Sequence, residues 1–128
     1  MAKYLLDSVI LIDHFNGISH ATEFIKEHYQ ECVISVITRA EVLTGFDDDN
    51  RDTAIEFLDK FNALIIDVAV ADLTAKFRQQ YRIKLPDSLQ ISLAIHHNLI
   101  LVSRNTKDFK ENHAYLGHEN VVLNPYCL

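Results

Sequence analysis

The stretch "KYLLDSVILID" (residues 3–13) joins two apolar runs through a single acid. The first run fits a buried strand over 3–7, and the second fits a short helix near 9–15. A carboxylate at their junction adds nothing to an apolar core. Asp7 therefore either caps the helix or belongs to a group of functional acids.

Strands and helices alternate along the rest of the chain. Further strands are predicted at 32–36, in "ALIID" (63–67), at 99–103 and at 121–124. Helices are predicted from an N-cap at Ser19, through "ITRAEVLTGF" (37–46), from a cap near Asn50, over "ADLTAKFRQQYR" (71–82) and from Asp87. Strands separated by helices pair in parallel through right-handed crossovers. The prediction is an α/β fold with a central parallel β-sheet flanked by helices on both faces.

Length and composition indicate one globular domain over 1–128, with an apolar share of 48%. The N-terminus shows no secretory signal, and no apolar run reaches the roughly 18 residues of a membrane-spanning helix. Two cysteines make no disulfide framework, and Cys32, inside "CVISV", is predicted to be buried. A reducing, cytoplasmic setting fits this composition.

The charge is unevenly distributed. The net charge is −6, yet segment 76–110 holds seven Lys and Arg against two Asp, a net +5, which leaves −11 for the remainder. Such asymmetry permits a basic face that binds a polyanion. An unevenly charged solvated surface explains it equally well.

Four acids are candidates for one site because each follows a strand or begins a buried helix: Asp7, Glu41, Asp87 and Asp108. Ligands of open parallel sheets lie at the carboxyl ends of the strands. Two carboxylates about 4 Å apart repel by roughly 4 kcal/mol at an effective dielectric of 20, and a hard divalent cation removes that repulsion. Mg²⁺ prefers oxygen ligands and can activate a water for attack on a phosphodiester.

Each acid also has a simpler explanation. Asp7 and Asp87 are both placed to cap helices, and Asp108 lies in a charged loop. Glu41 is harder to explain in this way, since its apolar neighbours make a solvated glutamate less expected. Asp13 is expected to face solvent or to pair locally.

Five stretches carry a family resemblance: "LLDSVILID", "ISVITRAEVLTG", "LPDSLQISLAI", "LILVSRNTKDF" and "VVLNPY". In order and spacing they resemble the PIN-domain ribonucleases, and among these the VapC-type toxins of toxin–antitoxin pairs, over essentially the whole chain. The resemblance implies a nuclease that cuts single-stranded RNA with Mg²⁺ or Mn²⁺. It also implies a VapB-like antitoxin and a toxin homodimer.

Carried over by position, the resemblance assigns metal binding and catalysis to Asp7, Glu41, Asp87 and Asp108. Ser8 and Asn105 stand as supporting residues, with the Asn105 position an alternative source of the fourth ligand. The cations expected to contact RNA are Arg104, Lys107, Arg78 and Arg82. Val9 and Gln90 depart from the family pattern, and Gln90 interrupts an otherwise apolar helix face.

Two other functions remain open from the residues. The first is a non-catalytic PIN-like module that binds RNA or supports assembly. The second is a phosphorylatable receiver, in which Asp67, after "ALII", would be the phosphoacceptor ending a middle strand. No convincing lysine accompanies Asp67 in that role.

Overall fold

The structure is a computed structural model, and it describes residues 1–105, 109–111 and 113–126. In these residues five strands form one sheet in the order β3-β2-β1-β4-β5, and every pairing is parallel. The strands are β1 (Tyr4–Leu6), β2 (Cys32–Ser35), β3 (Ala63–Leu64), β4 (Ile100–Val102) and β5 (Val122–Leu123). The predicted α/β fold with a parallel sheet is confirmed.

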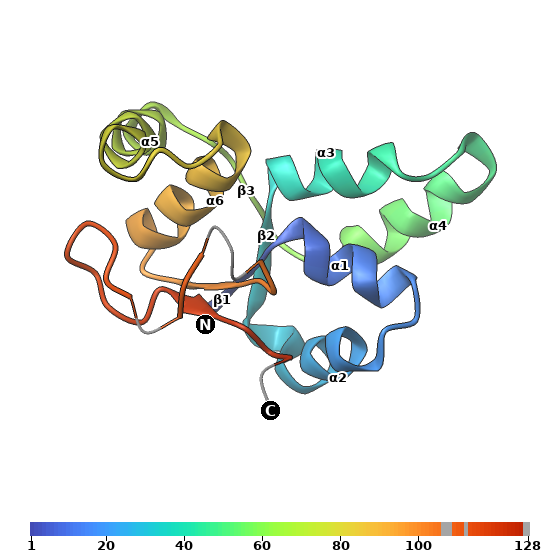
Figure 1. Cartoon of the computed structure of the whole chain (residues 1–128). Coiled ribbons are helices and arrows are strands. Elements are labelled where there is room, and N and C mark those ends of the chain that lie inside the picture. Colours follow the sequence, from blue (N-terminus) through green and yellow to red (C-terminus); the bar gives the residue numbers. More distant parts are fainter. Residues whose placement is uncertain (106–108, 112, 127–128) are drawn as a thin grey trace.

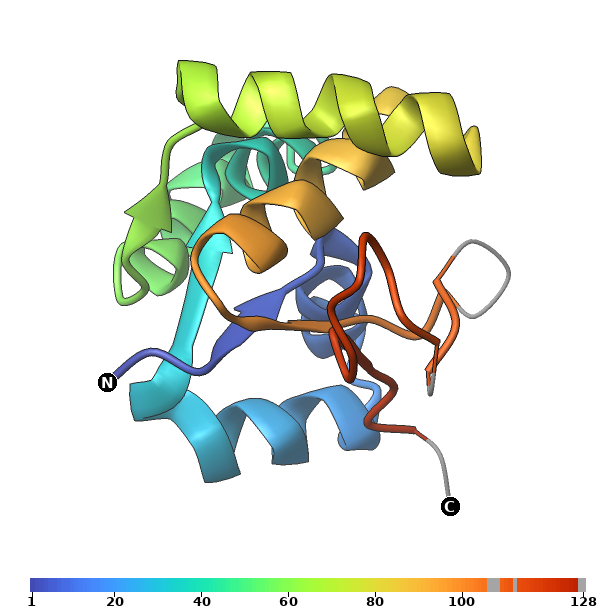
Figure 2. The same ribbon diagram turned by 90° about the vertical axis from the view of Figure 1, so that its left-hand side faces the viewer.

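Helices cover both faces of the sheet. They are α1 (Ser8–Phe15), α2 (Ser19–His28), α3 (Val36–Thr44), α4 (Asp48–Leu58), α5 (Val68–Tyr81) and α6 (Leu85–His96), and a short 3₁₀ helix, η1 (Tyr29–Glu31), follows α2. In Figure 1, α5 and α6 lie on one side of the strands and α1 to α4 on the other. Figure 2 shows α6 between α5 and the strands.

The sheet is apolar on both faces, as a parallel sheet covered by two helix layers requires. Alternate residues of β1 enter different cores: Leu5 packs in the cluster under α5 and α6, whereas Tyr4 and Leu6 pack in the cluster under α1 to α4. β2 repeats the pattern, with Val33 in the first cluster and Ile34 in the second. Alternate residues of each strand thus pack against the two helix layers on opposite faces of one sheet.

The predicted caps of three helices are wrong, and α5 begins at Val68 and not at residue 71. Ser19 is the first residue of α2, and Ile18 is its N-cap. Helix α4 is capped by Asp47, whose Oδ1 accepts the N–H of Asn50 at 3.0 Å. Helix α6 begins at Leu85 and includes Pro86 in its first turn. Proline is tolerated there because the N–H groups of the first turn have no acceptor within the helix. Asp87 therefore lies inside the first turn and is not the cap.

No helix within the described ranges is long and apolar enough to cross a membrane. The prediction that Cys32 is buried is confirmed. Burial, with a smaller contribution from the charge of Glu31, raises the pKa of the Cys32 thiol to about 12. The thiol therefore stays protonated at neutral pH and is unreactive.

Candidate functional site

Asp7 lies at the carboxyl end of β1, in the middle of the sheet, with 5% of its surface exposed. It is the N-cap of α1, and its Oδ1 accepts the backbone N–H of Ser8 at 2.9 Å. The same oxygen accepts from Gln90 Nε2 at 3.2 Å, and Oδ2 accepts from Ser103 Oγ at 2.8 Å. The prediction that Asp7 caps the helix is confirmed. Its side-chain partners are neutral, so its membership of a group of functional acids stays a prediction.

Gln90 connects Asp7 to the start of α3. Its Nε2 also donates to Thr38 Oγ1 at 2.7 Å, and its Oε1 accepts from Ser35 Oγ at 2.5 Å. Ser35 and Thr38 are fully buried, and Gln90 and Ser103 are 1% exposed. We call these five side chains, Asp7, Ser35, Thr38, Gln90 and Ser103, the Asp7 network. Its hydrogen bonds connect the carboxyl ends of β1, β2 and β4 with helices α3 and α6.

Asp87 and Glu41 each lie one helical turn from this network. Asp87 precedes Gln90 by three positions on α6, and Glu41 follows Thr38 by three positions on α3, so each acid shares a helix face with a network residue. Helix α3 leaves the carboxyl end of β2, and α6 runs back toward the start of β4. Both acids therefore lie beyond the carboxyl edge of the sheet, on the side where Asp7 ends β1.

The surroundings of these two acids differ from those of Asp7. Glu41 is exposed, so the expectation that its apolar neighbours keep it from solvent is wrong. Of the apolar residues around it, Val42 is buried, whereas Val36 at the start of α3 is 38% exposed. Asp87 is half-buried. Across residues 1–105, 109–111 and 113–126, no three His, Cys, Asp or Glu side chains are grouped tightly enough to hold one metal ion.

The backbone N–H groups of the two residues predicted to support the site connect with Asp7, and support by the Ser8 hydroxyl stays a prediction. Ser8 contacts Asp7 through its backbone N–H. The N–H of Asn105 donates to Ser103 Oγ at 3.1 Å, which directs the Ser103 hydroxyl toward Asp7. Asp108 and Lys107 lie outside the described residues, so the choice between Asp108 and the Asn105 position as fourth ligand stays a prediction.

The chemistry of the Asp7 network fits a hard cation. Within the described part of the chain, Asp7 has no cationic partner, although a buried carboxylate is normally paired with one. Its three hydrogen bonds come from neutral groups. The side chains around it offer oxygen and amide groups and no thiol or imidazole, which suits Mg²⁺ or Mn²⁺ better than zinc.

Asp13 shows the opposite arrangement. It is 7% exposed and accepts from Arg104 Nε at 2.6 Å and from the Tyr126 hydroxyl at 2.6 Å. Burial alone would raise the pKa of Asp13, but the hydrogen bonds from Arg104 and Tyr126, and the charge of Arg104, together bring it below its usual value. The expectation that Asp13 faces solvent or pairs locally is wrong, because its partners lie at the other end of the chain.

This ion pair bears on the predicted RNA contacts. Arg104 directs Nε and one Nη toward Asp13, and its side chain remains 47% exposed. Arg78 and Arg82 are exposed near the end of α5, where Arg78 Nε donates to the carbonyl of Ile83 at 3.1 Å. Contact of these arginines with RNA remains a prediction.

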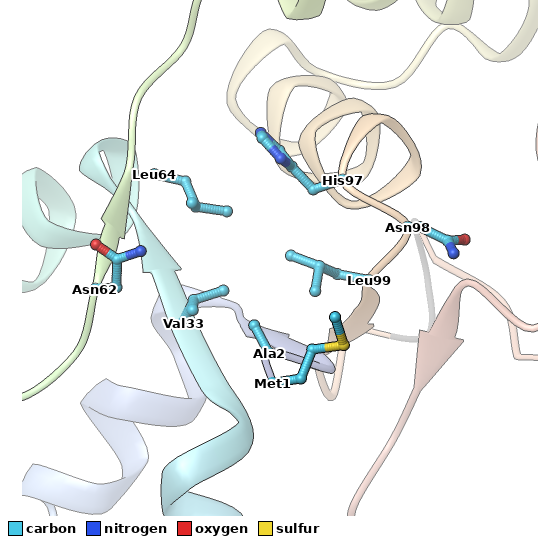
Figure 3. A pocket seen from close by; sticks show the side chains of 8 residues that line it. All are labelled: Met1, Ala2, Val33, Asn62, Leu64, His97, Asn98 and Leu99. Carbon is cyan, nitrogen blue, oxygen red and sulfur yellow. The ribbon is translucent and has the colours of Figure 1, made fainter.

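A pocket of about 340 Å³ opens at the opposite edge of the sheet. Figure 3 shows its lining side chains, which come from the N-terminal segment, β2, β3 and the turn between α6 and β4: Met1, Ala2, Val33, Asn62, Leu64, His97, Asn98 and Leu99. None of them is a carboxylate. The pocket lies toward the amino ends of the strands, whereas open parallel sheets bind ligands at the carboxyl ends. It is separate from the Asp7 network.

Comparison with known proteins identifies the family. The PIN domain model matches residues 4–113. A chain of a toxin–antitoxin complex from Klebsiella pneumoniae is 33% identical, with a TM-score of 0.83 over 98% of this chain and 100% of that one. A search of curated proteins found no significant match to the sequence.

Two more distant structures share the fold. They are a DNA-bound VapBC from Salmonella typhimurium (20% identity, TM-score 0.80, 98% and 99% covered) and FitAcB from Neisseria gonorrhoeae (21%, 0.78, 98% and 99%). The chain belongs to the PIN-domain family, which is a family of nucleases. The predicted resemblance to VapC-type members of that family is confirmed.

The receiver alternative is wrong. Asp67 follows β3, which is an edge strand and not a middle one. Its Oδ1 accepts the N–H of Val70 at 2.9 Å as the N-cap of α5. A carboxylate occupied in this way at the edge of the sheet does not match a central phosphoacceptor.

Proposed function

We propose that this protein is a Mg²⁺- or Mn²⁺-dependent endoribonuclease that cleaves single-stranded RNA as the toxin of a toxin–antitoxin pair. The observation that carries the proposal is Asp7, a buried carboxylate without a cationic partner among the described residues, at the carboxyl edge of a PIN-domain sheet. Glu41 and Asp87 one turn from its network supply further carboxylates on the same side.

In this proposal Asp7, Glu41 and Asp87, together with Asp108, would hold the cation partly through bound water. Mg²⁺ keeps several waters when it binds, and the three described acids are not grouped tightly enough to ligate one ion directly. A bound divalent ion lowers the pKa of a water and neutralises charge on the phosphodiester. The protein fixes the orientation of the Asp7 carboxylate through donors from Ser8, Gln90 and Ser103. The exposure of Glu41 leaves that side of the site open to a polymer such as RNA.

We assign the phosphate contacts chiefly to Arg78, Arg82 and Lys107. Arg104 is already paired with Asp13, so it offers the RNA only the exposed part of its side chain. Each phosphate neutralised by a cation makes binding weaker at higher salt. The basic residues thus supply affinity without sequence specificity.

The partners we propose are a VapB-like antitoxin and a second copy of this chain. The support for the antitoxin is the 33% identity to a chain of the toxin–antitoxin complex from Klebsiella pneumoniae. Such a nuclease needs an inhibitor in the cell. An antitoxin arginine placed against the carboxylates would neutralise them through charge-assisted hydrogen bonds.

The test compares cleavage of single-stranded RNA by the wild type and by Asp87→Asn, with Mn²⁺ and with a chelator. We expect metal-dependent cleavage by the wild type and a loss of at least 10²-fold in Asp87→Asn, because the variant lacks one carboxylate of the site. Asp72→Asn, the same change at an exposed acid of α5, is the matched control and should leave the rate unchanged. Equal cleavage by the wild type and Asp87→Asn would contradict the proposal, and RNA binding without cleavage would favour the non-catalytic module.

A further inference from the structure

Gln90 saturates one oxygen of Asp7. A carboxylate offers about four lone-pair positions, two on each oxygen. Oδ1 accepts from the Ser8 N–H and from Gln90 Nε2, and Oδ2 accepts only from Ser103 Oγ. Among the described donors, the position left open on Asp7 is therefore on Oδ2.

The orientation of the Gln90 amide follows from its neighbours. An ionised Asp7 only accepts hydrogen bonds, so the NH₂ group of Gln90 must face it. This leaves Oε1 for the hydroxyl of Ser35, at 2.5 Å, and the second N–H for Thr38, at 2.7 Å. Both N–H groups and the oxygen of the amide are used, and at 1% exposure no water competes with them.

We infer that Gln90 is a positioning residue that keeps Oδ1 of Asp7 occupied, so that Asp7 binds a divalent cation through Oδ2 alone. This inference rests on the proposed function, since it takes Asp7 as a ligand of the cation. Binding through one oxygen suits the near-ideal octahedral geometry that Mg²⁺ requires and that Mn²⁺ also adopts with oxygen ligands. Binding through both oxygens suits Ca²⁺, which accepts bidentate carboxylates.

Gln90→Met is a clean variant for testing this role. The two side chains have similar volume, so the core keeps its packing. Ser35 keeps a partner in Thr38 Oγ1, 3.3 Å from its Oγ, and Thr38 keeps the carbonyl of Leu6 at 3.5 Å. Both Asp7 Oδ1 and Thr38 Oγ1 lose Gln90 Nε2 as a donor, but Thr38 Oγ1 can still accept from Ser35 Oγ, so Asp7 is the group left with fewer donors.

The experiment measures Mn²⁺ binding by electron paramagnetic resonance of the free ion and Ca²⁺ binding by competition, with no RNA present. We expect Gln90→Met to weaken Mn²⁺ binding about 10- to 100-fold, as loss of a group that orients a metal ligand does. Ca²⁺ binding should weaken less, so the preference for Mn²⁺ over Ca²⁺ should fall. A role in folding alone would lower the urea midpoint and leave both dissociation constants of the folded protein unchanged.

Two further variants complete the test. Ser92→Ala is the matched control, because Ser92 is equally buried on α6 and its hydroxyl has no hydrogen-bond partner within the described structure. It should leave both dissociation constants unchanged. Thr38→Val removes the hydrogen bond that Gln90 donates to Thr38. It should weaken Mn²⁺ binding by a smaller factor than Gln90→Met does. If Gln90→Met does not fold, the Mn²⁺ dissociation constant of Thr38→Val tests the role of Gln90.

The outcomes separate this inference from the proposed function. Unchanged Mn²⁺ and Ca²⁺ constants in Gln90→Met, with wild-type cleavage intact, overturn the role of Gln90 alone. A wild type that neither binds Mn²⁺ nor cleaves RNA overturns both. Weaker Mn²⁺ binding with a reduced preference over Ca²⁺ supports the role of Gln90 even if the RNA assay fails.

Discussion

Two aspartates six positions apart on the same segment have opposite surroundings. Asp7 is buried among neutral donors, whereas Asp13 is buried against Arg104 and Tyr126. An ion pair neutralises Asp13 within the protein, and nothing in the described residues does so for Asp7. The ion pair of Asp13 stabilises the fold, whereas the surroundings of Asp7 leave a charge for a ligand to neutralise.

The Asp13 pair predicts a measurable loss of stability. Asp13→Asn should lower the free energy of unfolding at pH 7 by about 1–3 kcal/mol, because hydrogen bonds to a charged group are lost and Arg104 keeps an unmatched charge. Urea unfolding measures the change. Asp59→Asn, which breaks the exposed pair with Arg39, is the control and should change it by less than about 1 kcal/mol.

The pH dependence of this difference has a defined sign. Since the pKa of Asp13 in the folded state lies below the usual 3.8, the advantage of the wild type over Asp13→Asn is fully present above that value. It disappears as the pH falls through the lower pKa of the folded state. A difference that instead grows with falling pH would contradict the pairing.

At the scale of elements, short polar side chains cap four of the helices. Asp7, Asp47 and Asp67 are N-caps of α1, α4 and α5, and Ser35 is the N-cap of α3. The caps of α1 and α3 also belong to the Asp7 network. The groups that start these two helices therefore also arrange the candidate site.

Asp67 is a cap without that second role, and it predicts a purely structural effect. Asp67→Ala should destabilise the protein by about 1 kcal/mol, because the Val70 N–H loses its acceptor and the first turn of α5 loses a favourable charge. Thermal and urea unfolding measure the change. Asp72→Ala, at an exposed position within α5, should be neutral or slightly stabilising. RNA cleavage should persist in Asp67→Ala, and its loss would connect Asp67 with the site.

At the scale of the whole molecule, the layer of α1 to α4 is held together partly by His14. Its Nδ1 lies 2.9 Å from Thr22 Oγ1 of α2, and its ring stacks on Phe57 of α4 at 4.7 Å between centroids. Burial lowers the pKa of His14 below 6.5. The neutral ring is therefore the form that the folded protein favours.

A lowered histidine pKa makes stability depend on pH. The contribution of neutral His14 is fully present above pH 6.5 and is lost as the pH falls, because the unfolded chain takes up the proton first. We expect the free energy of unfolding of the wild type to fall more steeply between pH 7.5 and 5 than that of His14→Gln. Urea titrations at several pH values measure both slopes, and parallel slopes would contradict this.

The sequence by itself determined the order of strands and helices along the chain, the parallel pairing, the junction where Asp7 lies and the helix after the second strand that carries Glu41. These features depend on local periodicity and on which residues follow each strand, and both can be inferred along the chain. It missed the start of α6 by two residues, since the first turn of a helix tolerates Pro86. Gln90 stood out in the sequence only as an interruption of an apolar face.

The tertiary structure alone decided which side chains meet. Gln90 lies 83 positions from Asp7, and Arg104 lies 91 positions from Asp13. Nothing local distinguishes a glutamine that binds a carboxylate from one that faces solvent, or an arginine that pairs with an acid from one free to bind RNA. Those choices depend on the order of strands in the sheet and on the register of the helices packed over them, because hydrogen bonds form only within about 3 Å.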